Sequence, residues 1–369
     1  MEPQVDTGVS GPKAGRREWV GLAMLALPAL LVSMDMTVLH LAVPKVSEAL
    51  QPSSSQLLWV VDVYGFMIAG FLITMGTIGD RIGRRRLLLI GAAAFGAASL
   101  LAAFSTSPAM SIGARALLGI AGATVAPSTL ALIRTLFYDP QQRTVAISVW
   151  FTSFLAGAAI GPLLGGALLQ FFWWGSVFLI GVPVMVLLLV VGPILLPEHR
   201  DSTVGRVDLA SATLLGAVLA AIYGLKQIVE DGLSLIPCLA VVAGIVLAIV
   251  FIRRQHTLAE PLIDLSLFAQ RTFSVSLGAL TLSAVVMMGV GYLAAQYLQL
   301  VVGLSPLAAG LWMLPPLGAG IITMLLAPMI VHRIRPGFVI AGGLAVAAVG
   351  FAVVSTPAQH PGSPPSSSG

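Results

Sequence analysis

Charged residues are scarce in this sequence. Asp, Glu, Lys and Arg make up 9% of its 369 residues, whereas 57% are hydrophobic and the mean hydropathy is +0.98. A soluble domain carries about a quarter charged residues, so the composition excludes a soluble protein. Cysteine is also nearly absent, since the single Cys238 lies in an apolar run. One cysteine excludes a disulfide framework and any metal or iron–sulfur site built from several cysteines.

Signatures of enzymes and of ATP-driven pumps are missing too. The sequence has no G-x-x-x-x-G-K-S/T phosphate-binding loop, and the loops between its apolar runs are too short for a catalytic domain. We therefore expect no enzyme activity and no cofactor. The net charge of +4 would suggest nucleic acid in a soluble protein. Here the basic residues lie in short loops between apolar runs, so we expect membrane lipid as a partner and no nucleic acid.

Long apolar runs are what this sequence has in abundance. A membrane-spanning helix needs about 20 mainly apolar residues, and eleven runs meet that requirement. The polar segment 1–18 precedes a first run that is too long for a cleaved signal peptide, so we interpret that run as a permanent helix. The sequence therefore predicts an all-α integral membrane protein. The eleven runs are 19–43, 58–79, 87–104, 109–135, 144–170, 174–196, 209–229, 233–252, 272–301, 306–331 and 337–355.

Basic residues indicate the orientation of these helices. If the N-terminus lies inside, the inside segments hold 16 of the 19 Lys and Arg residues, and only Lys45, Arg115 and Lys226 remain. Short cytoplasmic loops of membrane proteins carry an excess of Lys and Arg. We therefore predict a multi-pass protein with a cytoplasmic N-terminus.

The segment 76–86, Gly-Thr-Ile-Gly-Asp-Arg-Ile-Gly-Arg-Arg-Arg, joins the second and third runs. Asp80 can pair with an arginine of the same segment and accept hydrogen bonds from a helix N-terminus, and its glycines permit a tight turn. The segment is either a topology signal alone or a latch that favours one conformation of a two-state carrier. The candidate latch residues are Gly76, Asp80, Arg81, Gly83, Arg84 and Arg85.

Three ionisable residues, Asp35, Asp62 and Arg115, lie well inside apolar runs. Such residues are costly within a bilayer, so each is a functional hypothesis. All three fall in the outer half of one six-helix unit, where two carboxylates and a guanidinium can hold or release a proton. The alternatives are a structural ion pair that locks helices together and, for Asp62, solvation near the surface. For His40, near the outer end of the first helix, we expect a lip or packing role.

The run 144–170 has glycines at every fourth position, Gly157, Gly161 and Gly165, together with Pro162 and Gly166. Such spacing makes a flat face that a partner helix can approach closely. Pro162 removes a backbone hydrogen bond and is expected to kink the helix. This face either serves tight packing alone or forms an interface that rocks.

The connections predict five segments: an N-terminal tail, a six-helix bundle, a linker with two further spanning helices, a partial C-terminal bundle and a disordered tail rich in Pro, Ser and Gly. Their bounds are 1–18, 19–196, 197–271, 272–355 and 356–369. The stretch 327–336 faintly repeats 79–86 in place and basicity. This echo is either a repeated half, as in many transporters, or an ordinary basic inside loop.

Together these motifs resemble the drug:proton antiporters of the major facilitator superfamily, in its fourteen-helix branch, and look most like the SmvA, LfrA and QacA type of efflux pump. Loop 76–86 is similar to the family's signature loop, and the pair of helices within 209–252 is similar to the branch's extra pair. Departures are His40 and Gly181, where asparagine is common, and Leu118, where glutamine is common. Segments similar to the branch's helix motifs are 34–44, 59–65, 115–122, 157–166 and 178–183.

This resemblance implies a major facilitator fold in the cytoplasmic membrane of a bacterium, driven by the proton gradient. The implied function is multidrug efflux: the export of lipophilic and quaternary ammonium cations and dyes in exchange for protons, by what we expect to be a monomer. Asp35 and Asp62 would couple to protons or meet the charge of the cation, and Arg115 would serve proton transfer.

Aromatic side chains are expected to add cation–π contacts to the cation, with Trp59, Tyr64 and Trp150 as candidates. Some family members carry a further acidic residue in the tenth helix. The run 306–331 has none here, so divalent cations are less expected as substrates.

The number of helices departs from the resembled branch, which has fourteen where this sequence predicts eleven. We expect a chain shortened at its C-terminus, by truncation, a shifted reading frame or cleavage, whose tail ends outside. Three functions stay open: an exporter of organic cations or a piece of one, a carrier of the same fold for another solute such as a sugar or peptide, and a membrane fragment that transports nothing.

Overall fold

The computed structural model describes residues 13–198, 209–257, 266–316, 318–320, 323 and 336–355. Within these ranges every regular element is a helix. Eight helical segments there are long and apolar enough to cross a membrane, which confirms the all-α membrane fold. Most of the linker at 197–208, the echo at 327–336 and the tail at 356–369 lie outside the described residues, and the domain bounds stay a prediction.

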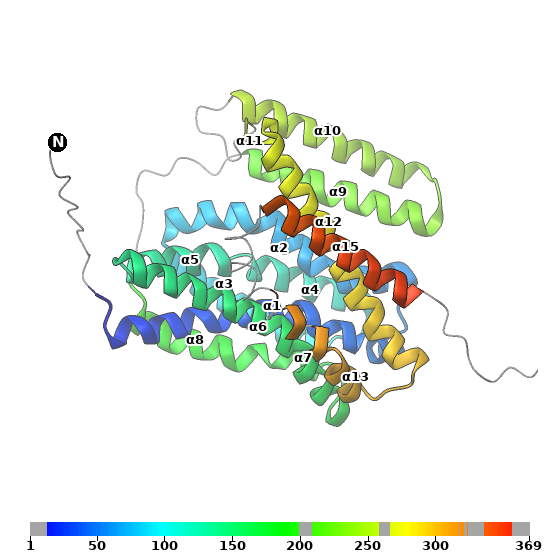
Figure 1. Cartoon of the computed structure of the whole chain (residues 1–369), viewed down its shortest axis with the longest axis horizontal. Coiled ribbons are helices and arrows are strands. Elements are labelled where there is room, and N and C mark those ends of the chain that lie inside the picture. Colours follow the sequence, from blue (N-terminus) through cyan, green and yellow to red (C-terminus); the bar gives the residue numbers. More distant parts are fainter. Residues whose placement is uncertain are drawn as a thin grey trace, which may run out of the picture. The chain divides into compact units, whose positions relative to one another are not determined.

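Two compact units make up the structure, one ending at Met313 and the other beginning at Leu314. The first unit holds the helices from α1 to α13 (Figure 1). Its helices are α1 (Arg16–Leu50), α2 (Ser54–Ile82), α3 (Arg84–Ala103), α4 (Pro108–Gly122), α5 (Val125–Leu136), α6 (Pro140–Phe171), α7 (Ser176–Leu179), α8 (Gly181–Leu195), α9 (Leu209–Asp231), α10 (Leu235–Thr257), α11 (Ser266–Ala269), α12 (Arg271–Gln296), η1 (Tyr297–Val301) and α13 (Pro306–Trp312). In the second unit, α15 spans Pro336–Ser355.

Side chains that cap helix starts set several of these boundaries. Ser53 accepts a hydrogen bond from the backbone N–H of Gln56, whose side chain accepts one from Ser53 in return, at 3.2 and 3.0 Å. This reciprocal pair is a capping box. Asp139 accepts from the backbone of Gln142 at 2.8 Å, directly before Pro140 begins α6. Proline suits that first position because a first-turn N–H has no partner within the helix.

The predicted run 109–135 is one spanning segment, Pro108–Leu136, which is interrupted where α4 ends at Gly122 and α5 begins at Val125. Between them the Thr124 hydroxyl donates to the Ala121 carbonyl at 2.7 Å. A threonine that bonds its own backbone competes with the helix ladder. The Thr124 side chain packs against α3 at Gly91, where an added Cβ would overlap its hydroxyl oxygen.

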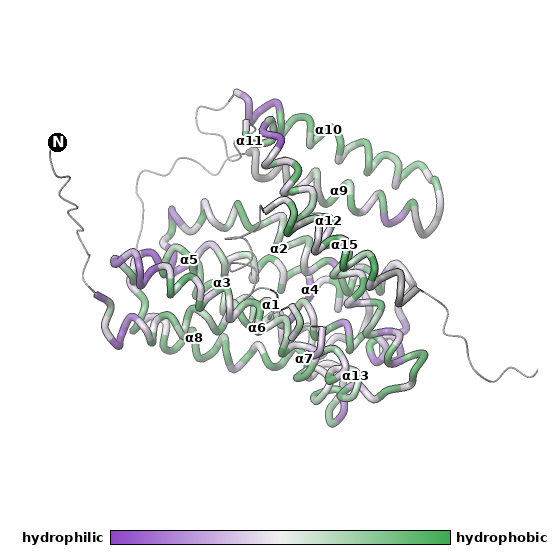
Figure 2. Tube along the Cα trace, viewed as in Figure 1, coloured by the Kyte–Doolittle hydropathy of each residue, from purple (hydrophilic) through white to green (hydrophobic). Residues whose placement is uncertain are grey.

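Helix α1 is the centre of the first unit and packs against α6, α8, α5 and α2. Helices α9 and α10 form a close pair on one side of the unit, and α9 packs on α2 (Figure 1). The two helices can pack this closely because each has a glycine at the contact. A Cβ on Gly224 would lie 2.6 Å from the Pro237 carbonyl oxygen, and one on Gly244 would lie 2.7 Å from the Ala221 nitrogen. Figure 2 shows hydrophobic midsections along most helices, with hydrophilic residues gathered towards helix ends.

Candidate functional site

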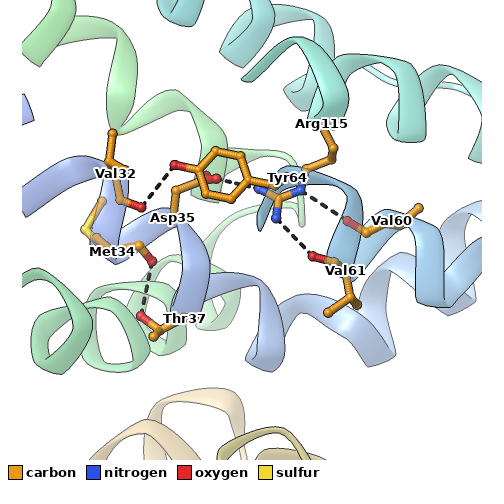
Figure 3. A network of polar contacts seen from close by, with 8 residues as sticks. All are labelled: Val32, Met34, Asp35, Thr37, Val60, Val61, Tyr64 and Arg115. Atoms are coloured by element: carbon orange, nitrogen blue, oxygen red, sulfur yellow. Dashed lines mark hydrogen bonds and ion pairs between the residues drawn. The ribbon is translucent and has the colours of Figure 1, made fainter. Parts of the chain in front are cut away.

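Asp35 of α1 and Arg115 of α4 form an ion pair inside the first unit (Figure 3). Both side chains are buried, Arg115 at 1% and Asp35 at 7% exposure. The guanidinium also donates to two carbonyls of α2, from Nε to Val60 at 3.1 Å and from Nη2 to Val61 at 3.4 Å. One side chain thereby ties three helices together, and removing either member of such a buried pair costs about 3–5 kcal/mol.

Tyr64 of α2 completes the surroundings of this guanidinium. Its ring centroid lies 4.5 Å from the Arg115 Cζ atom, and its hydroxyl donates to the Val32 carbonyl of α1 at 3.0 Å (Figure 3). The helices can come this close because α4 has Gly119 four residues after Arg115, on the same face. A Cβ at Gly119 would lie 2.5 Å from the Tyr64 carbonyl oxygen.

Asp62 lies apart from this pair and bonds to a different cation. Its Oδ2 atom is 2.6 Å from Nζ of Lys226, which α9 supplies. Of the three ionisable residues that the sequence singled out, Asp35 and Arg115 therefore pair with each other, whereas Asp62 pairs with Lys226. The sequence alone offered no signal that Lys226 would reach Asp62.

A cavity of about 300 to 1,000 Å³ is typical of small-molecule sites, and one of about 680 Å³ lies between α1, α2, α4 and α12. Asp62, Arg115 and His40 are its ionisable lining residues. Its apolar and aromatic lining includes Met36, Tyr64, Phe66, Met288 and Tyr292. Asp62 and Arg115, although unpaired with each other, thus face the same space.

Helix α12 and the following η1 contact the C-terminal half of α1 beside this cavity. Gln296 donates its amide to the His40 carbonyl at 2.9 Å, and Gln299 donates to the Leu41 carbonyl at 3.2 Å. The His40 ring meets the edge of Tyr292 with centroids 5.6 Å apart. His40 therefore combines lining and packing, whereas the two glutamines carried no signal that sequence reasoning used.

The three candidate aromatic residues occupy three different settings. Tyr64 lines the cavity beside Arg115. The Trp59 ring lies 5.1 Å from Nζ of Lys226. Trp150 donates its indole N–H to the Thr129 hydroxyl at 3.0 Å and lines a second, smaller cavity of about 220 Å³. Of the three, only Tyr64 is in contact with the Asp35–Arg115 pair.

The glycine face of α6 packs against α1. A Cβ at Gly157 would overlap the Leu30 carbonyl oxygen, one at Gly161 the Thr37 hydroxyl, and one at Gly165 the Val38 side chain. The helices are therefore in backbone contact, as the spacing of the glycines predicts.

Two neighbouring residues of that motif face α13 instead. A Cβ at Gly166 would lie 2.5 Å from the Pro306 carbonyl oxygen of the segment that begins α13. A Cβ at Gly310 of α13 would likewise lie 2.5 Å from the Pro162 carbonyl oxygen. Pro162 itself lies inside the continuous helix α6.

The candidate latch residues form the junction of α2 and α3. Asp80 pairs with Arg84 across one helical turn. Gly83 ends α2 with φ 108°, a conformation that glycine adopts without steric cost. Gly79, which sequence reasoning missed, leaves room for Arg84, whose Cδ lies 3.0 Å from the position of an added Cβ.

The other latch residues differ in their surroundings. Arg85 donates to the Leu196 carbonyl at 3.0 Å and so caps the C-terminal end of α8, where positive charge is favoured. Arg81 lies in the last turn of α2. Gly76 would place a Cβ 3.8 Å from Pro127 of α5, which is ordinary contact rather than a close approach.

Comparison with known proteins gives concordant matches. The family model of the Major Facilitator Superfamily matches residues 25–364. The multidrug efflux pump LfrA of Mycolicibacterium smegmatis is 46% identical over 355 residues, covering 96% of this chain and 70% of that protein. The methyl viologen resistance protein SmvA of Salmonella typhimurium is 38% identical over 337 residues, covering 91% of this chain and 68% of that protein.

A solved structure matches in fold. The crystal structure of the peptide transporter POT in complex with sulfate superposes with a TM-score of 0.59 and 17% identity, covering 84% of this chain and 67% of that one. At this identity the likeness concerns the fold and carries no information on substrate.

Proposed function

This chain belongs to the Major Facilitator Superfamily of membrane transporters, and we propose that it exports lipophilic and quaternary ammonium cations and dyes from the bacterial cytoplasm in exchange for protons. The relatives LfrA and SmvA, an efflux pump and a resistance protein, support export as the direction of transport. The many arginines at the α2–α3 junction support a cytoplasmic N-terminus in the inner membrane.

The observation that carries proton coupling is the buried Asp35–Arg115 pair beside the cavity. A proton on Asp35 removes the carboxylate charge that holds Arg115. The guanidinium then keeps only the Val60 and Val61 carbonyls, and a buried cation without its counter-charge is unstable. Protonation therefore favours a rearrangement of α1, α2 and α4, which is what coupling to a proton gradient requires.

The cavity itself supports the substrate class. It combines a carboxylate, Asp62, with aromatic and thioether side chains such as Phe66, Met288 and Tyr292. Aromatic faces attract organic cations, and flexible methionines adapt to ligands of different shape. A lining that is mainly apolar and aromatic offers few hydrogen-bonding groups to a sugar, so it favours lipophilic cations over such a solute.

Ethidium efflux from bacterial cells that express this chain tests the proposal. We expect efflux that stops when a protonophore collapses the proton gradient and that is lost in Asp35→Asn. Asp139→Asn is the matched control, because Asp139 caps the start of α6 and asparagine caps a helix as well as aspartate does. Efflux that survives gradient collapse would contradict proton coupling. A chain that inserts normally but exports nothing would support the third function, a membrane fragment without transport.

A further inference from the structure

Lys226 of α9 lies in a cage made by one face of α2. Its Nζ atom is 2.6 Å from the Asp62 carboxylate and 3.2 Å from the Leu58 carbonyl. The same atom lies 5.1 Å from the ring centroid of Trp59 and 5.4 Å from that of Phe66. Leu58, Asp62 and Phe66 recur every four residues and so form one stripe of α2, to which Trp59 adds a second ring.

This cage has the chemistry of a binding site for an organic cation. A carboxylate beside two aromatic faces neutralises a positive charge and attracts it to the π electrons of the rings. The cage also holds its cation away from water, since the Lys226 side chain is only 17% exposed. Lysine normally keeps its ammonium hydrated, so this placement is unusual for a lysine near a helix end.

The cage and the cavity share residues. Leu58, Asp62 and Phe66, which surround the ammonium group, also line the cavity of about 680 Å³ between α1, α2, α4 and α12. The Asp62 side chain is 38% exposed, so its carboxylate is accessible beside Lys226. A cation in the cavity therefore reaches the same carboxylate that Lys226 neutralises.

We propose that Lys226 is a tethered competitor of the transported cation: a monovalent lipophilic cation that enters the cavity takes Asp62 and displaces the Lys226 ammonium. This inference rests on the proposed export of organic cations. Lys226 keeps Asp62 paired when no substrate is bound. When a cation takes Asp62, the contact between Lys226 of α9 and Asp62 of α2 is lost, so α9 becomes free to move relative to α2.

Binding of ethidium to the purified protein in lipid nanodiscs tests this competition. Lys226→Met removes the charge from an unbranched side chain of similar length, and we expect it to tighten ethidium binding about tenfold, equivalent to about 1.4 kcal/mol. Lys226→Arg keeps the charge and is expected to bind as the unaltered protein does. Lys45→Met is the matched control, because Lys45 donates to a backbone carbonyl, that of Leu169, instead of a carboxylate.

A second background assigns the effect to Asp62. In Asp62→Asn there is no carboxylate for Lys226 and ethidium to compete for. Adding Lys226→Met to this variant is therefore expected to change the affinity for ethidium by less than twofold. Unchanged or weaker binding in Lys226→Met alone overturns the proposal. So does an equal gain in both backgrounds.

Amine labelling gives a readout that needs no variant. We expect ethidium to accelerate acylation of Lys226 by a water-soluble reagent, measured by mass spectrometry, while acylation of Lys45 stays the same. Labelling of Lys226 that is unchanged or slowed by ethidium overturns the displacement. Absence of ethidium binding altogether also overturns it, whereas the Asp35→Asn efflux experiment still decides the proposed function separately.

Discussion

The Thr37 hydroxyl of α1 lies 3.2 Å from the Ala158 carbonyl of α6 and donates a hydrogen bond to it. Pro162 follows Ala158 by four residues and has no N–H, so α6 itself has no donor for that carbonyl. Thr37 is equally close to the Met34 carbonyl of its own helix (Figure 3). A side chain of one helix thus satisfies the backbone group that a proline exposes in another, at the glycine face where the two helices touch.

Thr37→Val keeps the shape of this side chain and removes its hydroxyl. We expect the free energy of unfolding to fall by about 1–2 kcal/mol, because the Ala158 carbonyl is left without a donor. Thermal unfolding of the purified protein measures this, with Thr37→Ser as the control that keeps the hydroxyl.

Pro162→Ala restores the missing N–H, so Thr37→Val is expected to cost much less in that background. An equal loss of stability in both backgrounds would show that the hydroxyl does not act through the Ala158 carbonyl.

Gly157→Ala is expected to destabilise the protein by about 1–3 kcal/mol or to prevent folding, because the added Cβ overlaps the Leu30 carbonyl oxygen and overpacked backbone cannot move aside. The matched control is Gly113→Ala in α4, where nothing lies within 4 Å of the added atom. Alanine there is expected to be neutral or stabilising by up to about 1 kcal/mol. Yield and unfolding temperature compare the two, and equal effects would refute the packing argument.

Arg115→Met is expected to cost about 3–5 kcal/mol, because it leaves Asp35 buried without a counter-charge. Arg115→Lys keeps the charge but loses the planar fork that reaches the Val60 and Val61 carbonyls, so we expect a smaller loss of about 1–3 kcal/mol.

The double variant Asp35→Asn with Arg115→Met removes both charges of the pair. We expect it to regain stability relative to Arg115→Met while ethidium efflux stays absent. Recovery of efflux together with stability would show that the pair is structural alone.

Asp80→Asn separates the latch from the topology signal. The change removes the pair with Arg84 but keeps every arginine, and acidic residues contribute little to orientation. We expect unchanged orientation, measured by labelling of engineered cysteines, and efflux slowed about fivefold, which corresponds to the ~1 kcal/mol of a partly exposed ion pair. Glu48→Gln, at an exposed position near the end of α1, is the control. Efflux unchanged in Asp80→Asn would leave topology as the only role of this segment.

Sequence patterns predicted much of the fold because a bilayer constrains the composition of the helices that span it. A helix must be apolar over its spanning length and its cytoplasmic ends attract basic residues, and both are visible along the chain. The spacing of Gly157, Gly161 and Gly165 likewise predicted a close helix contact, because four-residue periodicity places residues on one helix face. The spacing did not indicate that the helix in contact with these glycines is α1.

What the sequence determined by itself is therefore the membrane, the family and the residues that bear charge within the apolar runs. Tertiary structure alone decided the partners: Arg115 pairs with Asp35, Asp62 pairs with Lys226, and Thr37 meets Ala158. The physical reason is that composition and periodicity report which face of a helix avoids water. Pairing depends on which faces of different helices meet, and at what height, so it is decided only when the helices pack.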